Sequence, residues 1–233
     1  MYRRLLAPLL LLFSMSACAQ PTAPATAAPQ AGPAPASAPA PRQGVDYEVL
    51  PTPQPTYGQG KIEVAEVFSY RCIHCAQFQP YVNNWKKNLP ADVRWEYVPG
   101  VFGGTWDDFA RAYFAAEILG VQAKTHDAVF KGVFVDKMVT TGTPDEIADM
   151  YGKFGVDRAK FLATSQSFGV TAKLNRAKQF ALRTGVNATP TIIVNGKYRV
   201  NVTNDRGFDG MLSTVSYLVA RERATTAATA KKP

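Results

Sequence analysis

The stretch Phe68-Ser69-Tyr70-Arg71-Cys72-Ile73-His74-Cys75-Ala76-Gln77-Phe78 places two cysteines three residues apart, with a histidine between them. The apolar run at 64–68 predicts a buried strand, and the apolar side chains after Cys72 recur at helical spacing, so this cysteine lies near a helix start. There the unpaired N–H groups and the positive end of the helix dipole favour a thiolate over a thiol. The stretch therefore predicts a strand–helix unit with a reactive cysteine pair and a low pKa for Cys72.

Such a pair has four possible uses. A zinc site needs four ligands, and the globular part offers only Cys72, Cys75, His74 and His126, with His74 inside the pair itself. Haem attachment needs a histidine directly after the second cysteine, where Ala76 stands. As a structural staple, so small a disulfide ring contributes only about 2 kcal/mol. Redox exchange by the pair itself, without a metal or cofactor, is favoured. A tethered binding protein with a static disulfide or metal site is the alternative.

The N-terminus predicts export. Residues 1–17 combine two arginines, an apolar run and small residues, which is typical of a signal peptide, and the run is too short to span a bilayer as a mature helix. Export places the protein in the oxidising periplasm. Met15-Ser16-Ala17-Cys18 resembles a bacterial lipobox, which makes Cys18 a lipidation candidate and gives a role to an odd third cysteine. Ala17-Cys18-Ala19 also fits ordinary cleavage, so a soluble mature protein stays open.

Composition separates a linker from a globular part. Residues 18–44 are rich in Pro and Ala with few large apolar groups, which predicts a disordered linker. The chain carries 26 Lys and Arg against 18 Asp and Glu, and removing Arg3 and Arg4 lowers the net charge from +8 to +6 (24 − 18). No stretch interleaves basic and aromatic residues in a nucleic-acid pattern, so a nucleic-acid partner is not expected.

The remaining elements predict one α/β domain over residues 45–222. Asn195-Gly196 between two strand-like runs predicts a hairpin, and Thr143-Pro144-Asp145-Glu146 predicts a capped helix start. A helical insertion is expected at about 105–183 and a disordered tail at 223–233. The expected strands are 47–50, 61–68, 92–98, 191–194 and 197–200, and the expected last helix is 209–223.

These motifs together resemble those of the DsbA-like thiol oxidoreductases of bacterial envelopes. The resemblance covers about residues 45–222 and rests on Glu66-x-Phe68-Ser69, on Cys72-Ile73-His74-Cys75, on Thr189-Pro190 before a strand, and on the helical block between them. It implies a thioredoxin-like fold with an inserted helical domain. It also implies an enzyme that introduces disulfides into reduced, unfolded exported proteins and is reoxidised by a DsbB-type membrane oxidase.

The resemblance assigns roles around the pair. Cys72 would form the mixed disulfide with a client thiol, and the deeper Cys75 would complete or reverse the exchange. His74 would stabilise the Cys72 thiolate. Pro190 would follow a cis peptide bond opposite the pair, which leaves the Thr189 backbone free to pair with an extended client.

One further residue and two departures complete the prediction. The family has an acid at the position of Glu66, buried below the pair, where it assists proton transfer. Glu96 stands where the family has a partnering lysine on the next strand, and Ile73 stands where the best-known member has proline. Within the same chemistry, a disulfide isomerase or reductase is the alternative, because threonine before the proline occurs in isomerases.

Overall fold

A mixed five-stranded sheet forms the centre of the protein, which a computed structural model describes over residues 40–230, with side chains as far as residue 226. The predicted signal peptide, Cys18 and most of the predicted linker lie outside the described residues. The strand order is β1-β5-β4-β2-β3, with β2 parallel to β3 and antiparallel to β4. The strands are β1 (Tyr47–Val49), β2 (Ile62–Phe68), β3 (Val93–Pro99), β4 (Thr191–Val194) and β5 (Tyr198–Asn201).

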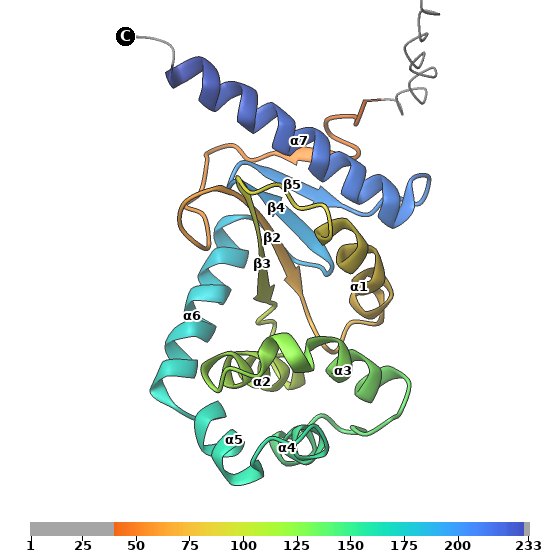
Figure 1. Cartoon of the computed structure of the whole chain (residues 1–233), viewed down its shortest axis with the longest axis vertical. Coiled ribbons are helices and arrows are strands. Elements are labelled where there is room, and N and C mark those ends of the chain that lie inside the picture. The colour runs from red at the N-terminus through yellow and green to blue at the C-terminus, as the bar shows by residue number, and fades with distance from the viewer. Residues whose placement is uncertain (1–39, 231–233) are drawn as a thin grey trace, which may run out of the picture. The chain divides into compact units, whose positions relative to one another are not determined.

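One face of the sheet is covered by two helices, α1 (Ile73–Lys86) and α7 (Gly207–Ala230) (Figure 1). Their apolar side chains pack on β2, β4 and β5 in one core cluster, which includes Phe78, Val82, Leu212, Val215 and Leu218 together with Val64, Ile192 and Val200. Because β2 has a hydrogen-bonded neighbour on each side, the chain leaving its C-terminal end enters α1 from a fixed position.

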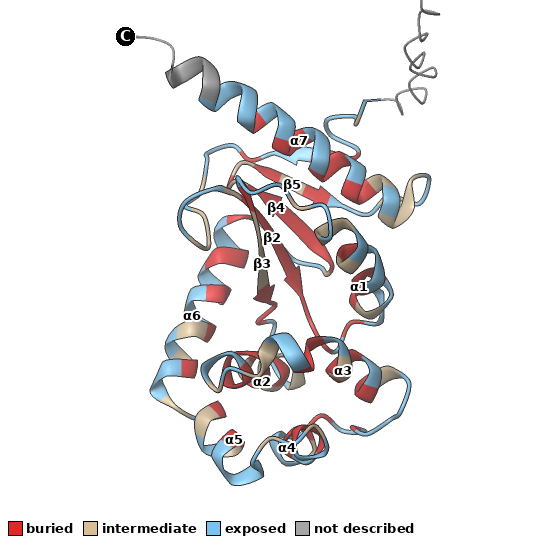
Figure 2. Ribbon diagram, in the orientation of Figure 1, coloured by how far each residue is buried: buried red, intermediate tan, exposed pale blue. Residues whose placement is uncertain are grey.

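The predicted helical insertion at 105–183 is confirmed by five consecutive helices. Their buried sides turn inward and their outer sides are exposed (Figure 2). Three of them begin at a cap whose side chain accepts from the N–H three residues on: Thr143, Asp157 and Ser167. The helices are α2 (Thr105–Ile118), α3 (Gln122–Phe134), α4 (Pro144–Lys153), α5 (Arg158–Ser165) and α6 (Phe168–Arg183).

The predicted hairpin is also confirmed. Asn195 and Gly196 both have positive φ, 50° and 65°, which suits a tight turn between antiparallel strands. Gly196 also lies against the loop before β2, where a Cβ would clash with the carbonyl oxygen of Gln54. A side chain at this position would therefore force the two loops apart.

Two boundaries differ from the sequence prediction. Arg42 already belongs to the folded part, because it donates to Asp46 and Asp205. The last helix continues to Ala230, beyond the expected end at residue 223. Ala is the strongest helix former, and Arg223, bonded to Asp92, ties this segment to the turn before β3. The prediction of a disordered tail from 223 is therefore wrong for residues up to 230.

Candidate active site

Cys72 is the N-cap of α1. Its backbone is extended (φ −98°, ψ 112°), and its Sγ accepts from the N–H of Cys75 at 3.4 Å. The sulfur thus takes the place that the side-chain oxygen of Ser or Asp takes in an ordinary N-cap. The predicted position of this cysteine at a helix start is confirmed.

The surroundings of Cys72 favour its thiolate. Its pKa is lowered to about 6, first by a hydrogen bond from the Cys75 side chain, then by the side chain of Thr189 and by the backbone N–H groups of Cys75 and His74. Burial acts in the opposite direction. Cys72 is 8% exposed, so only a small part of the residue is open to a partner.

Cys75 lies deeper, in the first turn of α1, and is 1% exposed. Burial raises its pKa well above the ordinary value, and the hydrogen bond to Cys72 and the charge of Glu66 raise it further. Both cysteines are free thiols in this structure. The two sulfurs therefore differ sharply in acidity although they are one helical turn apart.

The residues between the two cysteines point outward. Ile73 is 43% exposed, and the imidazole Nδ1 of His74 lies 3.3 Å from Oε1 of Gln77. The group of His74 that lowers the pKa of Cys72 is its backbone N–H. A direct contribution of the imidazole to the thiolate stays a prediction.

The Thr189–Pro190 peptide bond is cis, as the family resemblance implies. The Sγ of Cys72 donates to the carbonyl oxygen of Thr189 at 3.3 Å, so the loop before β4 faces the cysteine pair across a gap of one hydrogen bond. Pro190 is buried and Thr189 half-buried. Residues 117 positions apart in the chain thus form the two sides of one site.

Glu66, in the middle of β2, is 1% exposed, and among the described residues its Oε2 has no hydrogen-bond partner. Burial raises its pKa to about 8, and the positive charge of Lys86 opposes that rise. The charge on Cys72 raises it as well. Glu66 is therefore a buried acid whose pKa depends on the charge of Cys72.

Lys86 is the residue of this site that the sequence analysis did not find. It is the last residue of α1, and its Nζ lies 4.8 Å from the centre of the Tyr97 ring. Tyr97, not Glu96, is the residue of β3 paired with Glu66. The Oε1 of Glu96 lies 3.2 Å from Nε of Arg94. The spacing of Gln79, Asn83 and Lys86 along one side of α1 is the signal that could have indicated an inward-facing lysine.

His126, considered above only as a metal ligand, lies in an aromatic cage at the base of the insertion. Its Nδ1 bonds the Tyr70 hydroxyl at 2.8 Å, its ring packs against Phe68 and Tyr97, and burial lowers its pKa to about 3. Within the side chains that the structure describes, no three His, Cys, Asp or Glu residues gather as metal ligands. Over residues 40–230, no helix is long and apolar enough to cross a membrane.

A C-x-x-C pair at the start of a helix after a central strand, faced by a cis-proline loop, defines a thioredoxin-fold thiol–disulfide protein. Comparison with known proteins names the branch. The model of the DSBA-like thioredoxin domain family matches residues 98–212. A "Thiol:disulfide interchange protein DsbA" of Pseudomonas aeruginosa is 38% identical over 181 residues, which are 78% of this chain and 85% of that protein. The protein of the same name from Azotobacter vinelandii is 37% identical, over 78% of this chain and 84% of its own length.

Solved structures agree. The crystal structure of oxidoreductase DsbA from Xylella fastidiosa has a TM-score of 0.74 and 41% identity, and the match covers 79% of this chain and 98% of that one. The oxidoreductase NmDsbA3 from Neisseria meningitidis has a TM-score of 0.68 and 32% identity, over 80% and 99% of the two chains. The chain belongs to the DsbA family. It is a protein thiol–disulfide oxidoreductase that acts through its own cysteine pair without a cofactor, on a thioredoxin fold with a helical insertion.

Proposed function

We propose that this oxidoreductase works as an oxidase, which introduces disulfides into reduced, unfolded exported proteins. The observation that supports this direction is the contrast between the two sulfurs. The pKa of Cys72 is lowered to about 6, whereas that of Cys75 is raised well above the ordinary value. A stabilised thiolate exists only in the reduced protein, so it favours the state in which the pair has given its disulfide away.

The size of this effect follows from the pKa. At pH 7, a thiol of pKa about 6 is stabilised about tenfold through its thiolate relative to a free cysteine of pKa about 8.5. That ratio corresponds to about 1.4 kcal/mol, or about 30 mV of added oxidising potential for a two-electron couple. The stabilised thiolate of Cys72 alone therefore makes a moderate contribution to the oxidising potential of the pair.

The reaction consists of two exchanges. A client thiolate attacks Sγ of Cys72, the Cys72–Cys75 bond breaks, and Cys75 leaves as a thiolate that takes up a proton. A second client thiolate then attacks the client sulfur of the mixed disulfide, and Cys72 leaves as its thiolate. The client loses two electrons, and the pair gains them. Reoxidation of the pair needs an external acceptor, for which we propose a DsbB-type membrane oxidase.

The surrounding residues have distinct parts in this scheme. Cys72 is the sulfur that joins the client. Cys75 is the sulfur that leaves when the mixed disulfide forms and that attacks Cys72 when the pair closes again. Glu66 gives the departing Cys75 its proton and takes it back on reoxidation. The Thr189–Pro190 loop positions the client, whose backbone replaces Cys72 as the partner of the Thr189 carbonyl. His74 adds to the stabilisation of the thiolate.

Export and anchoring complete the proposal. Residues 1–17 direct the chain to the periplasm, and Cys18 carries a lipid that holds the domain at the membrane through the Pro- and Ala-rich segment that follows it. The lipobox-like sequence supports this. Subcellular fractionation tests it: the Cys18→Ala variant is expected in the soluble fraction, and its retention in the detergent-rich fraction would contradict a lipid anchor.

The oxidase direction is tested by refolding a reduced client that contains disulfides. A catalytic amount of the wild-type protein, with oxidised glutathione present to reoxidise the pair, is expected to accelerate disulfide formation. Cys72→Ala and Cys75→Ala should each abolish the acceleration, because neither variant can form the Cys72–Cys75 disulfide. Equal acceleration by Cys72→Ala would instead favour a binding protein. Equilibration with glutathione then measures the reduction potential. A potential near the thioredoxin value of about −270 mV would identify a reductase rather than an oxidase.

A further inference from the structure

The buried acid of the active site lacks an obvious positive partner on the neighbouring strand. Glu66 is paired in the β2–β3 ladder with Tyr97, and the preceding residue of β3, Glu96, is negative and lies beside Arg94. Among the described residues, Oε2 of Glu66 accepts no hydrogen bond. A carboxyl group in this position is strongly biased toward its neutral form unless a positive charge approaches it by another route.

The C-terminal end of α1 supplies such a charge. Lys86 is half-buried, and its Nζ lies 4.8 Å from the centre of the Tyr97 ring. Tyr97 is the residue of β3 that pairs with Glu66. The same side of α1 carries Gln79, whose Nε2 donates to the Tyr97 hydroxyl at 2.9 Å. The helix α1 thus carries the cysteine pair at its first turn and Lys86 at its last. Gln79 in its middle and Lys86 at its end both contact Tyr97.

We propose that Lys86 is a positioning residue whose positive charge stabilises the carboxylate form of Glu66. It thereby sets the pH range in which Glu66 takes the proton of Cys75. This inference rests on the proposed roles of Glu66 and Cys75. It assigns to a helix residue the part that the family resemblance assigns to a lysine on the adjacent strand.

The charges that face these two groups come from three sides. Glu66 interacts with Lys86 and with the thiolate of Cys72, and its own charge acts on Cys75 and on Tyr97. Lys86 is faced by Glu66 from β2, by Tyr97 from β3, and by His126 and Asp127 from α3. Burial lowers the pKa of Lys86, and the carboxylates of Glu66 and Asp127 raise it. The carboxylate of Asp127 is shared with Asn83, whose amide donates to it at 2.8 Å.

The step that depends on this pair is the closure of the cysteine disulfide. The thiol proton of Cys75 passes to the Glu66 carboxylate, the Cys75 sulfur attacks Sγ of Cys72, and the mixed-disulfide partner leaves as a thiolate. Below the pKa of Glu66 the carboxylate is scarce, so the rate rises with pH until Glu66 is ionised. Loss of the Lys86 charge raises the pKa of Glu66 and moves that rise to higher pH.

The test follows the reaction of the reduced, full-length protein with oxidised glutathione, quenched and resolved by mass spectrometry. The first step forms the Cys72–glutathione disulfide, and the second releases glutathione. For Lys86→Met we expect the pH midpoint of the second step to move up by about one unit, with an about tenfold slower second step at pH 7. Lys86→Arg should restore the wild-type midpoint. In a Glu66→Gln background, Lys86→Met should no longer shift the profile.

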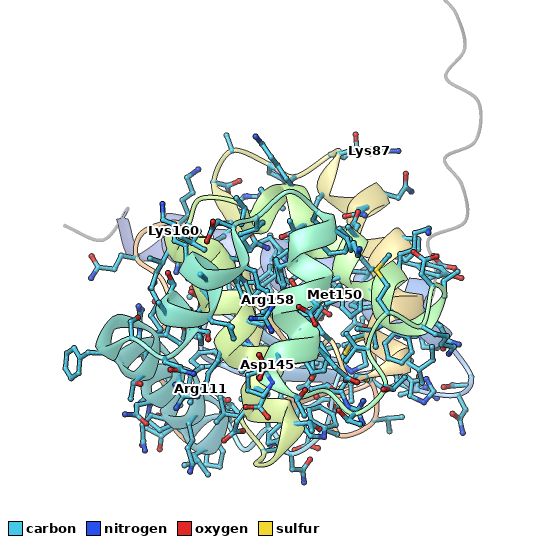
Figure 3. All side chains as sticks on the ribbon, turned by 90° about the horizontal axis from the view of Figure 1, so that it is seen from below. Lys87, Arg111, Asp145, Met150, Arg158 and Lys160 are labelled. Carbon is cyan, nitrogen blue, oxygen red and sulfur yellow. The ribbon has the colours of Figure 1, made fainter. Side chains whose placement is uncertain are left out.

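Lys87 provides a matched control, because it is the same residue type one position on but exposed at the outer edge of the molecule (Figure 3). Lys87→Met should leave the midpoint unchanged. An unchanged midpoint in Lys86→Met, or an equal shift in the Glu66→Gln background, would overturn the inference. If Lys86→Met does not fold, as judged by circular dichroism, Lys86→Gln takes its place with the same expected shift. Failure of the wild type to form the Cys72–glutathione disulfide would instead contradict the proposed function.

Discussion

Two glutamates lie on the same strand, three residues apart, and both are buried, yet their surroundings differ completely. Glu63 is fully buried at the start of β2, where its carboxylate accepts from the N–H groups of Tyr57 and Gly58 and from Arg94. Glu66, nearer the cysteines, leaves one carboxylate oxygen without a partner among the described residues. Burial raises the pKa of Glu66 to about 8.

The two glutamates suit different purposes: Glu63 stabilises the fold, and the surroundings of Glu66 suit proton transfer. The Glu63 carboxylate, bonded by an arginine and two backbone N–H groups, fixes the loop before β2 to the sheet. A buried carboxyl without donors has nearly equal free energies as acid and as carboxylate at physiological pH, which suits a group that must exchange protons. The same residue type on one strand thus serves two purposes because only its hydrogen-bond partners differ.

A large loss of stability at a single pH is expected on removal of the partner of Glu63. Arg94→Met leaves a buried carboxylate with only its backbone donors, and breaking a buried ion pair costs about 3–5 kcal/mol. We therefore expect the free energy of unfolding, measured by urea denaturation of the reduced protein, to fall by about 3 kcal/mol. The Cys72 alkylation profile should not change, because Arg94 is not among the groups that set the pKa of Cys72.

Arg158 is the control for this experiment. It bonds Asp145 and Asp149, as Arg94 bonds Glu63, but on the exposed surface of α4 and α5, where Figure 3 shows Arg158 and Asp145. Exposed ion pairs contribute little, since water and salt screen them. Arg158→Met should therefore have a much smaller effect than Arg94→Met. Equal losses would mean that burial does not distinguish the two arginines.

The comparison also shows which features could be predicted from sequence. The strand–helix unit, the helix start at Thr143 and the hairpin at Asn195-Gly196 depend on contacts within a few residues, and all were predicted correctly. The cis bond before Pro190 followed from the family resemblance rather than from local chemistry.

The partners of the two glutamates depend on tertiary structure and were not predicted. Glu63 lies 31 residues from Arg94, and nothing in the local pattern of either strand indicates that they meet. The sequence does not single out Lys86, because its place over the Tyr97 ring depends on how helix and sheet pack. The end of α7 was missed for the same reason, since Arg223 is tied by Asp92, far away in the chain.

A second prediction uses the pH dependence of the free energy of unfolding to isolate the contribution of Glu66. Since its pKa is raised in the folded state, its contribution to stability is complete below the unfolded value near 4.5 and is lost as the pH rises through about 8. Glu66→Gln removes this dependence. The stability of the variant relative to wild type should therefore increase from pH 4.5 to 8, by up to about 1.4 kcal/mol per pH unit.

His126 has the opposite sign, which is why the difference between variants is the quantity to measure. Its folded pKa is lowered to about 3, so its contribution is present above the unfolded value near 6.5 and is lost as the pH falls toward 3. In both proteins this contribution is the same and cancels. A flat difference between Glu66→Gln and wild type across pH 4.5–8 would contradict a raised pKa for Glu66.

The smallest expected effect tests what Tyr97 contributes beside Glu66. Tyr97→Phe removes the hydroxyl that accepts from Gln79 at 2.9 Å but keeps the ring beneath Lys86. One N–H of the Gln79 amide keeps Asn83 as its acceptor at 3.0 Å, while the other loses its acceptor, and the loss of stability should be about 1 kcal/mol. The pH midpoint of disulfide closure should stay at the wild-type value, because the charge on Lys86, and not the tyrosine hydroxyl, stabilises the Glu66 carboxylate. A shifted midpoint in Tyr97→Phe would instead place the hydroxyl in the path of the proton.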